Sequence, residues 1–477
     1  MTIKSYILDN KSSLSLVTLG LAISIMTGLC ILMFPEEIHF VSVSSICIWI
    51  TILIITSIKY SFYDFIFCNS FLIFEFPFFH NVTSVMRFIL LFLLGGVSAY
   101  LTRKEKVSKN PVALGLGLVA LYSIGTSFWS FYPTISLLKG ISILLMAVFL
   151  FFGPSALQLL HPGIGAKGFV IKVFFYFSII IVISNALFFI IMPGSSFSDG
   201  RFYGWMGNPN NVGAIYGIFI LPVLGYEFKR DRFGFARLAF MLTFLLAAIQ
   251  LFASRSRAGL LAGLFSLLVL SFGQKKQVKK LSYLTIIGML GFISLLVSLS
   301  NWENSLLRNL IYRNEVTLQG SGRLPAMAEV WNNFKSHLIL GSGLGVADTG
   351  AKRKALVTSS SGFQTEKSNS YLAALEELGI VGCLILIMTL LLPICKACLR
   401  ELSAHTFETD RLNLTLAAIL IAGLVNTNFE AWLLSVGSFE GFYFWIVASL
   451  LFFEEKKEVP KKGEGLYTVG KTQLAGV

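Results

Sequence analysis

Four arginines lie where phosphate binding is chemically possible. Arg201 precedes a segment rich in glycine and asparagine, residues 204–211, and Arg255 and Arg257 lie between two apolar stretches that almost no loop separates. Arg323 lies in a later hydrophilic segment. The guanidinium group is planar and permanently charged, so it suits phosphate oxygens, and near a membrane it is costly unless it is paired or faces water. Converging arginines would therefore bind an anionic headgroup, although single side chains that reach lipid phosphates or cap a helix would give the same pattern.

Candidates for proton transfer lie farther along the chain. His337 precedes the glycine-rich turn 341–345, which permits either a close backbone approach or flexibility. Glu329 precedes both, and Glu376 and Glu377 open the next apolar stretch, where two carboxylates need partners. A positioned base contributes about 10²- to 10⁴-fold to a rate. The sequence leaves open whether the histidine is a packing residue and whether the two carboxylates pair with the arginines.

The elements that position these residues are membrane helices. Of the 477 residues, 55% are hydrophobic and only 13% are charged, whereas a soluble domain carries about 25% charged residues. With about 20 residues needed per spanning helix, the chain can supply more than a dozen spans and one sizeable loop. Fourteen apolar stretches are candidates: 14–34, 39–58, 61–78, 84–101, 111–127, 134–153, 169–192, 209–227, 238–254, 258–273, 281–300, 371–395, 412–427 and 434–453. The stretches 61–78 and 258–273 could be partial or re-entrant, which lowers the count to twelve.

The distribution of Lys and Arg predicts the orientation. If the amino terminus is cytoplasmic, 24 of these 38 residues lie on the inner side and 3, namely Arg201, Arg255 and Arg257, in short outer loops. This ratio follows the positive-inside rule, so both termini are expected to be cytoplasmic and the loop 301–370 to be outside. The middle of that loop has the periodicity of an amphipathic helix through Met327, Val330, Trp331 and Phe334.

The net charge of +13 does not indicate a nucleic-acid partner, because the basic residues form separate clusters between apolar runs. Four of the six cysteines lie inside apolar stretches and act as small hydrophobic residues. Cys395 and Cys398 have C-x-x-C spacing, but no second Cys or His pair lies nearby in the sequence to complete a metal site. Neither a metal nor a cofactor is expected.

An ordered series of motifs resembles the O-antigen ligase and polymerase family of bacterial glycan assembly. The series covers about residues 200–452, and each motif alone is short. Its members are Gly207-Asn208-Pro209-Asn210, Ser256-Arg257-Ala258, Ser321-Gly322-Arg323 with Trp331, Gly341-Ser342-Gly343-Leu344-Gly345, and Asn369-Ser370-Tyr371-Leu372 with Glu377-Leu378-Gly379 and Gly382.

The resemblance implies a helical membrane glycosyltransferase with a polyprenyl-linked donor. Arg257 and Arg323 match the arginines thought to bind the donor diphosphate, and Arg255 is a possible substitute because the Ser-Arg dipeptide is doubled. The family's ligases carry a histidine base where this chain has Ser368, which weakens the ligase assignment and favours polymerisation. Because the lipid diphosphate is already a good leaving group, catalysis needs charge neutralisation and orientation of the acceptor hydroxyl.

These arguments predict an all-α polytopic membrane protein with 12–14 transmembrane helices and one long periplasmic loop, in the bacterial inner membrane. It would polymerise or ligate polyprenyl-diphosphate-linked oligosaccharides on the periplasmic side, with undecaprenyl-diphosphate-linked oligosaccharide, an acceptor glycan or lipid, and membrane lipids as partners. A lipid-linked glycan flippase is the alternative from another class, although the chain lacks the obvious internal repeats of transporters. A non-catalytic assembly partner is a third interpretation, because of Ser368.

The expected regions are N-terminal transmembrane helices (1–192), central helices with the Asn-Pro-Asn and Ser-Arg motifs (193–300), the periplasmic loop (301–370), C-terminal helices (371–453) and a cytoplasmic tail (454–477). The expected catalytic residues are Arg257, Arg323, His337 and Glu377. The expected substrate-binding residues are Arg255, Arg201, Asn210, Ser368, Asn369 and Tyr371.

Overall fold

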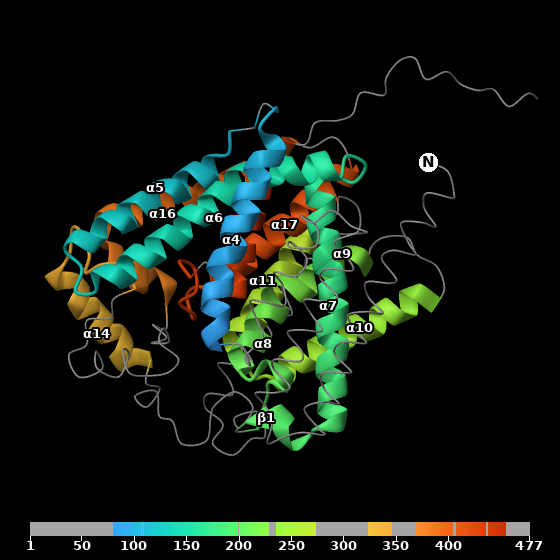
Figure 1. Cartoon of the computed structure of the whole chain (residues 1–477). Coiled ribbons are helices and arrows are strands. Elements are labelled where there is room, and N and C mark those ends of the chain that lie inside the picture. Colours follow the sequence, from blue (N-terminus) through green and yellow to red (C-terminus); the bar gives the residue numbers. More distant parts are fainter. Residues whose placement is uncertain are drawn as a thin grey trace, which may run out of the picture.

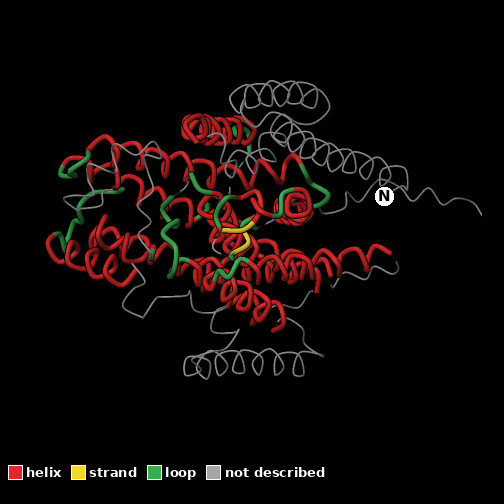
Figure 2. Tube along the Cα trace, turned by 90° about the horizontal axis from the view of Figure 1, so that it is seen from below, coloured by secondary structure: helices red, strands yellow, loops and turns green. Residues whose placement is uncertain are grey.

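The computed structural model of the chain is almost entirely helical where it is described (Figures 1 and 2). It describes residues 80–105, 107, 109–198, 200–228, 235–272, 323–345, 369–403, 407–435 and 437–454. The expected spans at 14–34, 39–58, 61–78 and 281–300, Ser368 and most of the tail lie outside these residues. Every other expected span coincides with a helix. The all-α polytopic membrane fold is thus confirmed.

The described part of the chain contains the following helices, given in chain order. They are α4 (His80–Thr102), α5 (Pro111–Gly125), α6 (Pro133–Leu160), α7 (Gly165–Ile191), α8 (Pro209–Ile215), the π-helical segment η5 (Tyr216–Ile220), α9 (Leu221–Phe228), α10 (Phe235–Ala253), α11 (Arg257–Phe272), α14 (Arg323–Ser336), α16 (Ser370–Ser403), α17 (Phe407–Asn426) and α18 (Phe439–Phe452). Short elements between them are η2 (Thr126–Phe128), η3 (Gly194–Ser196), the strands β1 (Phe197–Ser198) and β2 (Arg201–Phe202), and η4 (Gly204–Met206).

Among the described residues, four helical segments are long and apolar enough to cross a membrane: Pro111–Phe128, Pro133–Leu160, Gly165–Ile191 and Ser370–Pro393. Shorter apolar helices accompany them at Phe88–Thr102, Leu238–Ala253, Arg257–Ser271, Arg411–Asn426 and Phe439–Phe452. The expected amphipathic helix of the long loop is α14.

Capping residues explain where several helices begin. Asn110 and Asn208 each precede a proline, and each side chain accepts a backbone N–H of the first turn. Ser438 caps α18 in the same way. Proline suits the first helical position because its missing N–H would have no partner in the helix. These caps fix the starts of α5, α8 and α18 in an apolar environment that offers little water to unsatisfied backbone groups.

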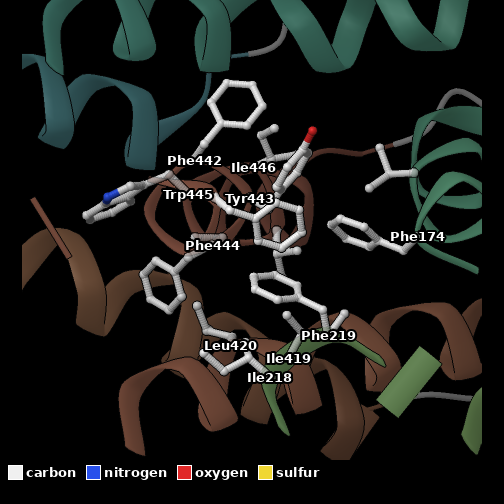
Figure 3. Close-up of a cluster of buried hydrophobic side chains, with 14 of the residues drawn as sticks. Phe174, Ile218, Phe219, Ile419, Leu420, Phe442, Tyr443, Phe444, Trp445 and Ile446 are labelled. Carbon is white, nitrogen blue, oxygen red and sulfur yellow. The ribbon is translucent and has the colours of Figure 1, made fainter. Parts of the chain in front are cut away.

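The core is built around α18, in which every residue from Phe439 to Leu451 is buried. A helix that is apolar on all sides must be surrounded by other helices. Figure 3 shows Phe174 of α7 and Phe219 of η5 near Tyr443 of α18. The ring of Tyr443 lies 5.4 Å from that of Phe174 and 6.5 Å from that of Phe219, measured between centroids. Helices from the middle and from the C-terminal part of the chain therefore share one core.

The helices form two groups around this core. In Figure 1, α5, α6 and α16 run side by side in one group, with α14 at one end of it. In the other group α11 packs against α8, η5, α9 and α17, and α10 packs against α7 and α9. α17 contacts both α11 and α16, so it connects the two groups. The start of α16 lies beside the end of α17, because Ser370 N donates to the Thr427 carbonyl oxygen at 2.9 Å.

α8 and α11 cross at two glycines that face each other. A Cβ atom added to Gly259 would overlap the backbone of Gly213, and one added to Gly213 would overlap the Ser256 side chain. Small residues let the backbones of membrane helices approach closely. The start of α11, where Arg257 lies, is therefore held directly against the segment that follows Asn208.

We expect Gly259→Ala to destabilise the folded protein by about 1–3 kcal/mol, the usual cost of overpacking a close contact. The thermal unfolding temperature in detergent measures this. Gly96→Ala in α4 is the matched control, because a Cβ atom there meets nothing within 4 Å. Equal melting temperatures for the two variants would show that the crossing tolerates a methyl group.

Candidate active site

The first part of the site is a pair of loops that Arg201 joins. Its Nε donates to the Ser254 carbonyl oxygen at 3.1 Å, and its Nη2 donates to Asn210 Oδ1 at 2.8 Å. Ser254 directly follows α10 and begins the turn to α11, and Asn210 lies in the first turn of α8. The structure therefore brings Arg201, Asn210 and the Ser-Arg motif together. Arg201 and Asn210, which were both expected to bind substrate, are thus hydrogen-bonded to each other.

The two arginines of the doubled Ser-Arg motif differ in conformation. Arg255 is half-buried and has a φ of 50°, in the left-handed region that few residues other than glycine adopt. Its guanidinium lies against Gly200 in the hairpin of β1 and β2, where an added Cβ atom would come within 3.4 Å of Nη1. Arg257 begins α11 and is exposed. A strained, half-buried arginine beside an exposed one is an arrangement that local folding preference alone does not explain.

The second part of the site is an interlock between the glycine-rich turn and α16. α16 breaks at Gly379, which has φ 64° and ψ −169°, a conformation that essentially only glycine adopts. The turn 341–345 fills the break: Ser342 N donates to Glu376 O at 2.9 Å, and Gly343 N donates to Glu377 O at 3.0 Å. Beyond the break, Ile380 N and Val381 N donate to the carbonyl oxygens of residues 338 and 339, at 3.0 and 3.3 Å. The glycines of the turn and Gly379 thus allow the two backbones to approach each other closely.

The interlock places the two carboxylates that the sequence singled out. Glu376 is 1% exposed, and its Oε1 accepts a hydrogen bond from Asn333 Nδ2 of α14 at 3.0 Å. Glu377 is 8% exposed. Asn333 was not among the expected site residues, since a single asparagine on an amphipathic helix carries no distinctive signal. The carboxyl group of Glu376 is therefore tied to the long loop.

The N-terminal half of the chain holds the other side of the same turn. Trp129 Nε1 donates to the Gly341 carbonyl oxygen at 3.2 Å, and Ser136 Oγ donates to the Leu344 carbonyl oxygen at 3.0 Å. Leu344 N donates to Thr126 Oγ1 at 3.3 Å. The first half, which the motif series did not cover, therefore contributes directly to the positioning of this segment.

His337 lies in the turn after α14 and is half-buried. Its Nδ1 is 2.9 Å from Ser336 Oγ, and its ring meets the edge of Phe131 at a centroid distance of 5.9 Å. Arg323 is the first residue of α14. The side chains of Arg323 and Glu329 lie outside the described part of the structure, so their expected roles remain predictions.

The third part of the site is the start of α16, where Asn369 and Tyr371 make structural hydrogen bonds. Asn369 Oδ1 accepts the N–H groups of Tyr371 and Leu372 at 2.8 and 3.0 Å, and thus caps α16. Its Nδ2 donates to the Asn428 carbonyl oxygen at 2.9 Å. Tyr371 Oη donates to the Leu424 carbonyl oxygen at 3.2 Å. These bonds fasten α16 to the end of α17, and substrate binding by the two residues stays a prediction.

Among the described residues, no three His, Cys, Asp or Glu side chains are grouped so that they could hold a metal ion. The segments described above offer guanidinium groups, amides and hydroxyls around the turn after α10, and buried carboxylates at the interlock. Such groups can neutralise and orient a phosphorylated substrate and can accept a proton from a hydroxyl.

Comparison with known proteins agrees with the chemical groups that the candidate site offers. Residues 242–387, about a third of the 477-residue chain, match the family model of the O-antigen ligase. The matched region runs from α10 into α16 and includes both arginines of the Ser-Arg motif, α14 and the interlock. No curated protein matches the chain. The O-antigen ligase domain and the apolar helices support a bacterial membrane protein of polysaccharide biosynthesis, and the domain suggests a glycan-transferring enzyme.

Proposed function

We propose that the chain is an inner-membrane glycosyltransferase that transfers an oligosaccharide from a polyprenyl diphosphate to an acceptor sugar on the periplasmic side. The observation that supports the proposal is the turn after α10, where Arg201 joins Ser254 to Asn210 and Arg255 rests against Gly200, beside the exposed Arg257. An O-antigen ligase match over residues 242–387 supports the same reaction class.

In the proposed reaction, Arg257 and Arg323 neutralise the diphosphate, with Arg255 beside them. The acceptor hydroxyl oxygen attacks the anomeric carbon, the bond from that carbon to the diphosphate oxygen breaks, and polyprenyl diphosphate leaves with the electron pair. The hydroxyl proton passes to a base, for which His337, Glu329, Glu376 and Glu377 are the candidates. Guanidinium groups fixed in a site of low polarity stabilise the developing charge more strongly than water does.

Polymerisation of repeat units is the preferred variant of this reaction. Ser368 replaces the histidine that the resemblance assigns to ligases, and serine does not take up a proton near neutral pH without a base of its own. Both termini would be cytoplasmic, since the Lys and Arg distribution of the sequence favours that orientation.

Arg257→Ala and Arg323→Ala are each expected to lower the release of undecaprenyl diphosphate at least tenfold, and to shorten or remove surface polysaccharide in the bacterium. The measurements are thin-layer analysis of the lipid released by purified protein from undecaprenyl-diphosphate-linked oligosaccharide, and gel analysis of cell-surface glycan. Normal glycan in both variants, at normal protein levels, would remove the proposed site. Transport of the donor without release of lipid diphosphate would instead indicate a flippase.

A further inference from the structure

The guanidinium group of Arg201 makes its hydrogen bonds within the protein and connects two motifs. Two different nitrogens of its guanidinium donate, Nε to the Ser254 carbonyl oxygen and Nη2 to Asn210 Oδ1. A lysine ammonium in its place would be a single point of charge and could not reproduce a planar fork of fixed donors. The geometry of Arg201 is therefore that of a brace between the end of α10 and the start of α8.

A buried polar network lies deeper between α7, η5 and α10. Asn185 Nδ2 donates to Tyr216 Oη at 3.0 Å, and Tyr216 Oη donates to Gln250 Oε1 at 2.6 Å. Gln250 Nε2 donates to the Val182 carbonyl oxygen at 3.1 Å. The three polar side chains are 0%, 0% and 5% exposed. Amides and hydroxyls in apolar helices are expensive unless they are satisfied, and a satisfied network fixes one arrangement of its helices.

The network also holds the hairpin that carries Arg201. Trp205 N donates to Asn185 Oδ1 at 3.1 Å, and Trp205 Nε1 donates to Ser184 Oγ at 2.9 Å. Between Arg201 and Trp205, Gly204 has a φ of 55°, and a Cβ atom there would overlap Asn185 Oδ1. The chain can therefore pass this close to Asn185 only with glycine at that position.

These contacts close into a ring. Gln250 and Ser254 are one helical turn apart on α10 and are linked by the Ser254 N–H, which donates to Gln250 O at 2.9 Å. From Ser254 the ring passes through Arg201 and the hairpin to Asn185, and then through Tyr216 back to Gln250. Arg255 follows Ser254 directly and rests against Gly200 of the same hairpin. The strained arginine is thus held on both sides by parts of the ring.

We infer that Asn185, Tyr216, Gln250 and Arg201 are one unit of positioning residues, which touch no substrate and set the geometry of Arg255 and Arg257 for a diphosphate group. This inference rests on the proposed function and concerns the same site. It assigns to Arg201 a bracing role in place of direct substrate binding. It also accounts for a π-helical segment at Tyr216, since such segments often occur at functional sites.

The test is the affinity of full-length purified protein, in nanodiscs, for undecaprenyl diphosphate, with undecaprenyl monophosphate as the reference ligand. Tyr216→Phe removes one hydroxyl and conserves the ring, and Arg201→Lys conserves the charge. We expect each to raise the Kd for the diphosphate about tenfold, with a small change for the monophosphate. The double variant should be little weaker than either single one, because residues of one network are not additive. If Arg201 acted by its charge alone, Arg201→Lys would bind normally, and that result would overturn the inference.

Ser449→Ala is the matched control for stability. It removes a buried hydrogen bond from Asn110 Nδ2 to Ser449 Oγ, which lies at the start of α5 and near the end of α18, away from the Ser-Arg motif. Its melting temperature should fall as in Tyr216→Phe, while its Kd should not change. An equal rise in Kd for Ser449→Ala and Tyr216→Phe would show that the network contributes only to general stability, and would overturn the inference. Failure of the wild-type protein to prefer the diphosphate would instead count against the proposed function.

Discussion

Gly379→Ala is expected to lower strongly the amount of folded protein that accumulates in the membrane. The φ and ψ of this residue lie in a region that costs a residue with a side chain about 1–3 kcal/mol. A Cβ atom would also lie 2.5 Å from Gly341 N, and one on Gly341 would lie 2.5 Å from Gly379 N. Neither backbone can move aside without breaking the hydrogen bonds of the interlock, so we expect a total loss of roughly 3 kcal/mol or more for each variant.

Thermal unfolding in detergent and limited proteolysis between residues 337 and 345 measure this loss. Gly207→Ala is the matched control, because Gly207 also has a positive φ, 71°, but a Cβ atom there meets nothing within 4 Å. It should show only the conformational cost of about 1–2 kcal/mol. If Gly379→Ala melted no lower than this control, the interlock would contribute nothing beyond local backbone preference.

The interlock also shows which part of the fold the sequence could not predict. The apolar runs that fall in the described part of the chain coincide with helices, because hydrophobic length largely determines a membrane helix. The pairing of residues 341–345 with the break at Gly379 depends on contacts between segments far apart in the chain. Glycine in the sequence is compatible with flexibility or with close approach, and only the tertiary neighbour decides between them.

For the candidate site, the residue types in the sequence were more informative than any spatial arrangement that could be predicted from it. Arginines outside the positive-inside pattern drew attention to the turn after α10, where Arg201 bonds to Asn210 and Arg255 rests against Gly200. The hydrogen bonds of Arg201 could not be predicted, since a guanidinium suits a carbonyl oxygen as well as a phosphate. Asn185 and Gln250 carried an unused signal, because polar side chains within apolar helices are rare and usually functional.

Arg255→Asn is expected to lower the rate of glycan transfer by about 10²- to 10³-fold, the range seen when one fixed donor to a developing negative charge is removed. The reason for so large an effect is that Arg255 is half-buried and held in one conformation, whereas the exposed Arg257 is screened by water. Asparagine tolerates a left-handed backbone, so the fold should survive the substitution. The rate of undecaprenyl diphosphate release under single-turnover conditions is the measurement.

Arg255→Gly separates the chemical role from the conformational one. Glycine adopts a φ of 50° without strain, so this variant should melt at or above the temperature of the wild-type protein and still lose the activity. A protein that is more stable and less active is the result expected when strain is held at a functional site. Retained transfer in both Arg255 variants would assign the diphosphate to Arg257 and Arg323 alone, and the left-handed turn would then serve only to connect α10 to α11.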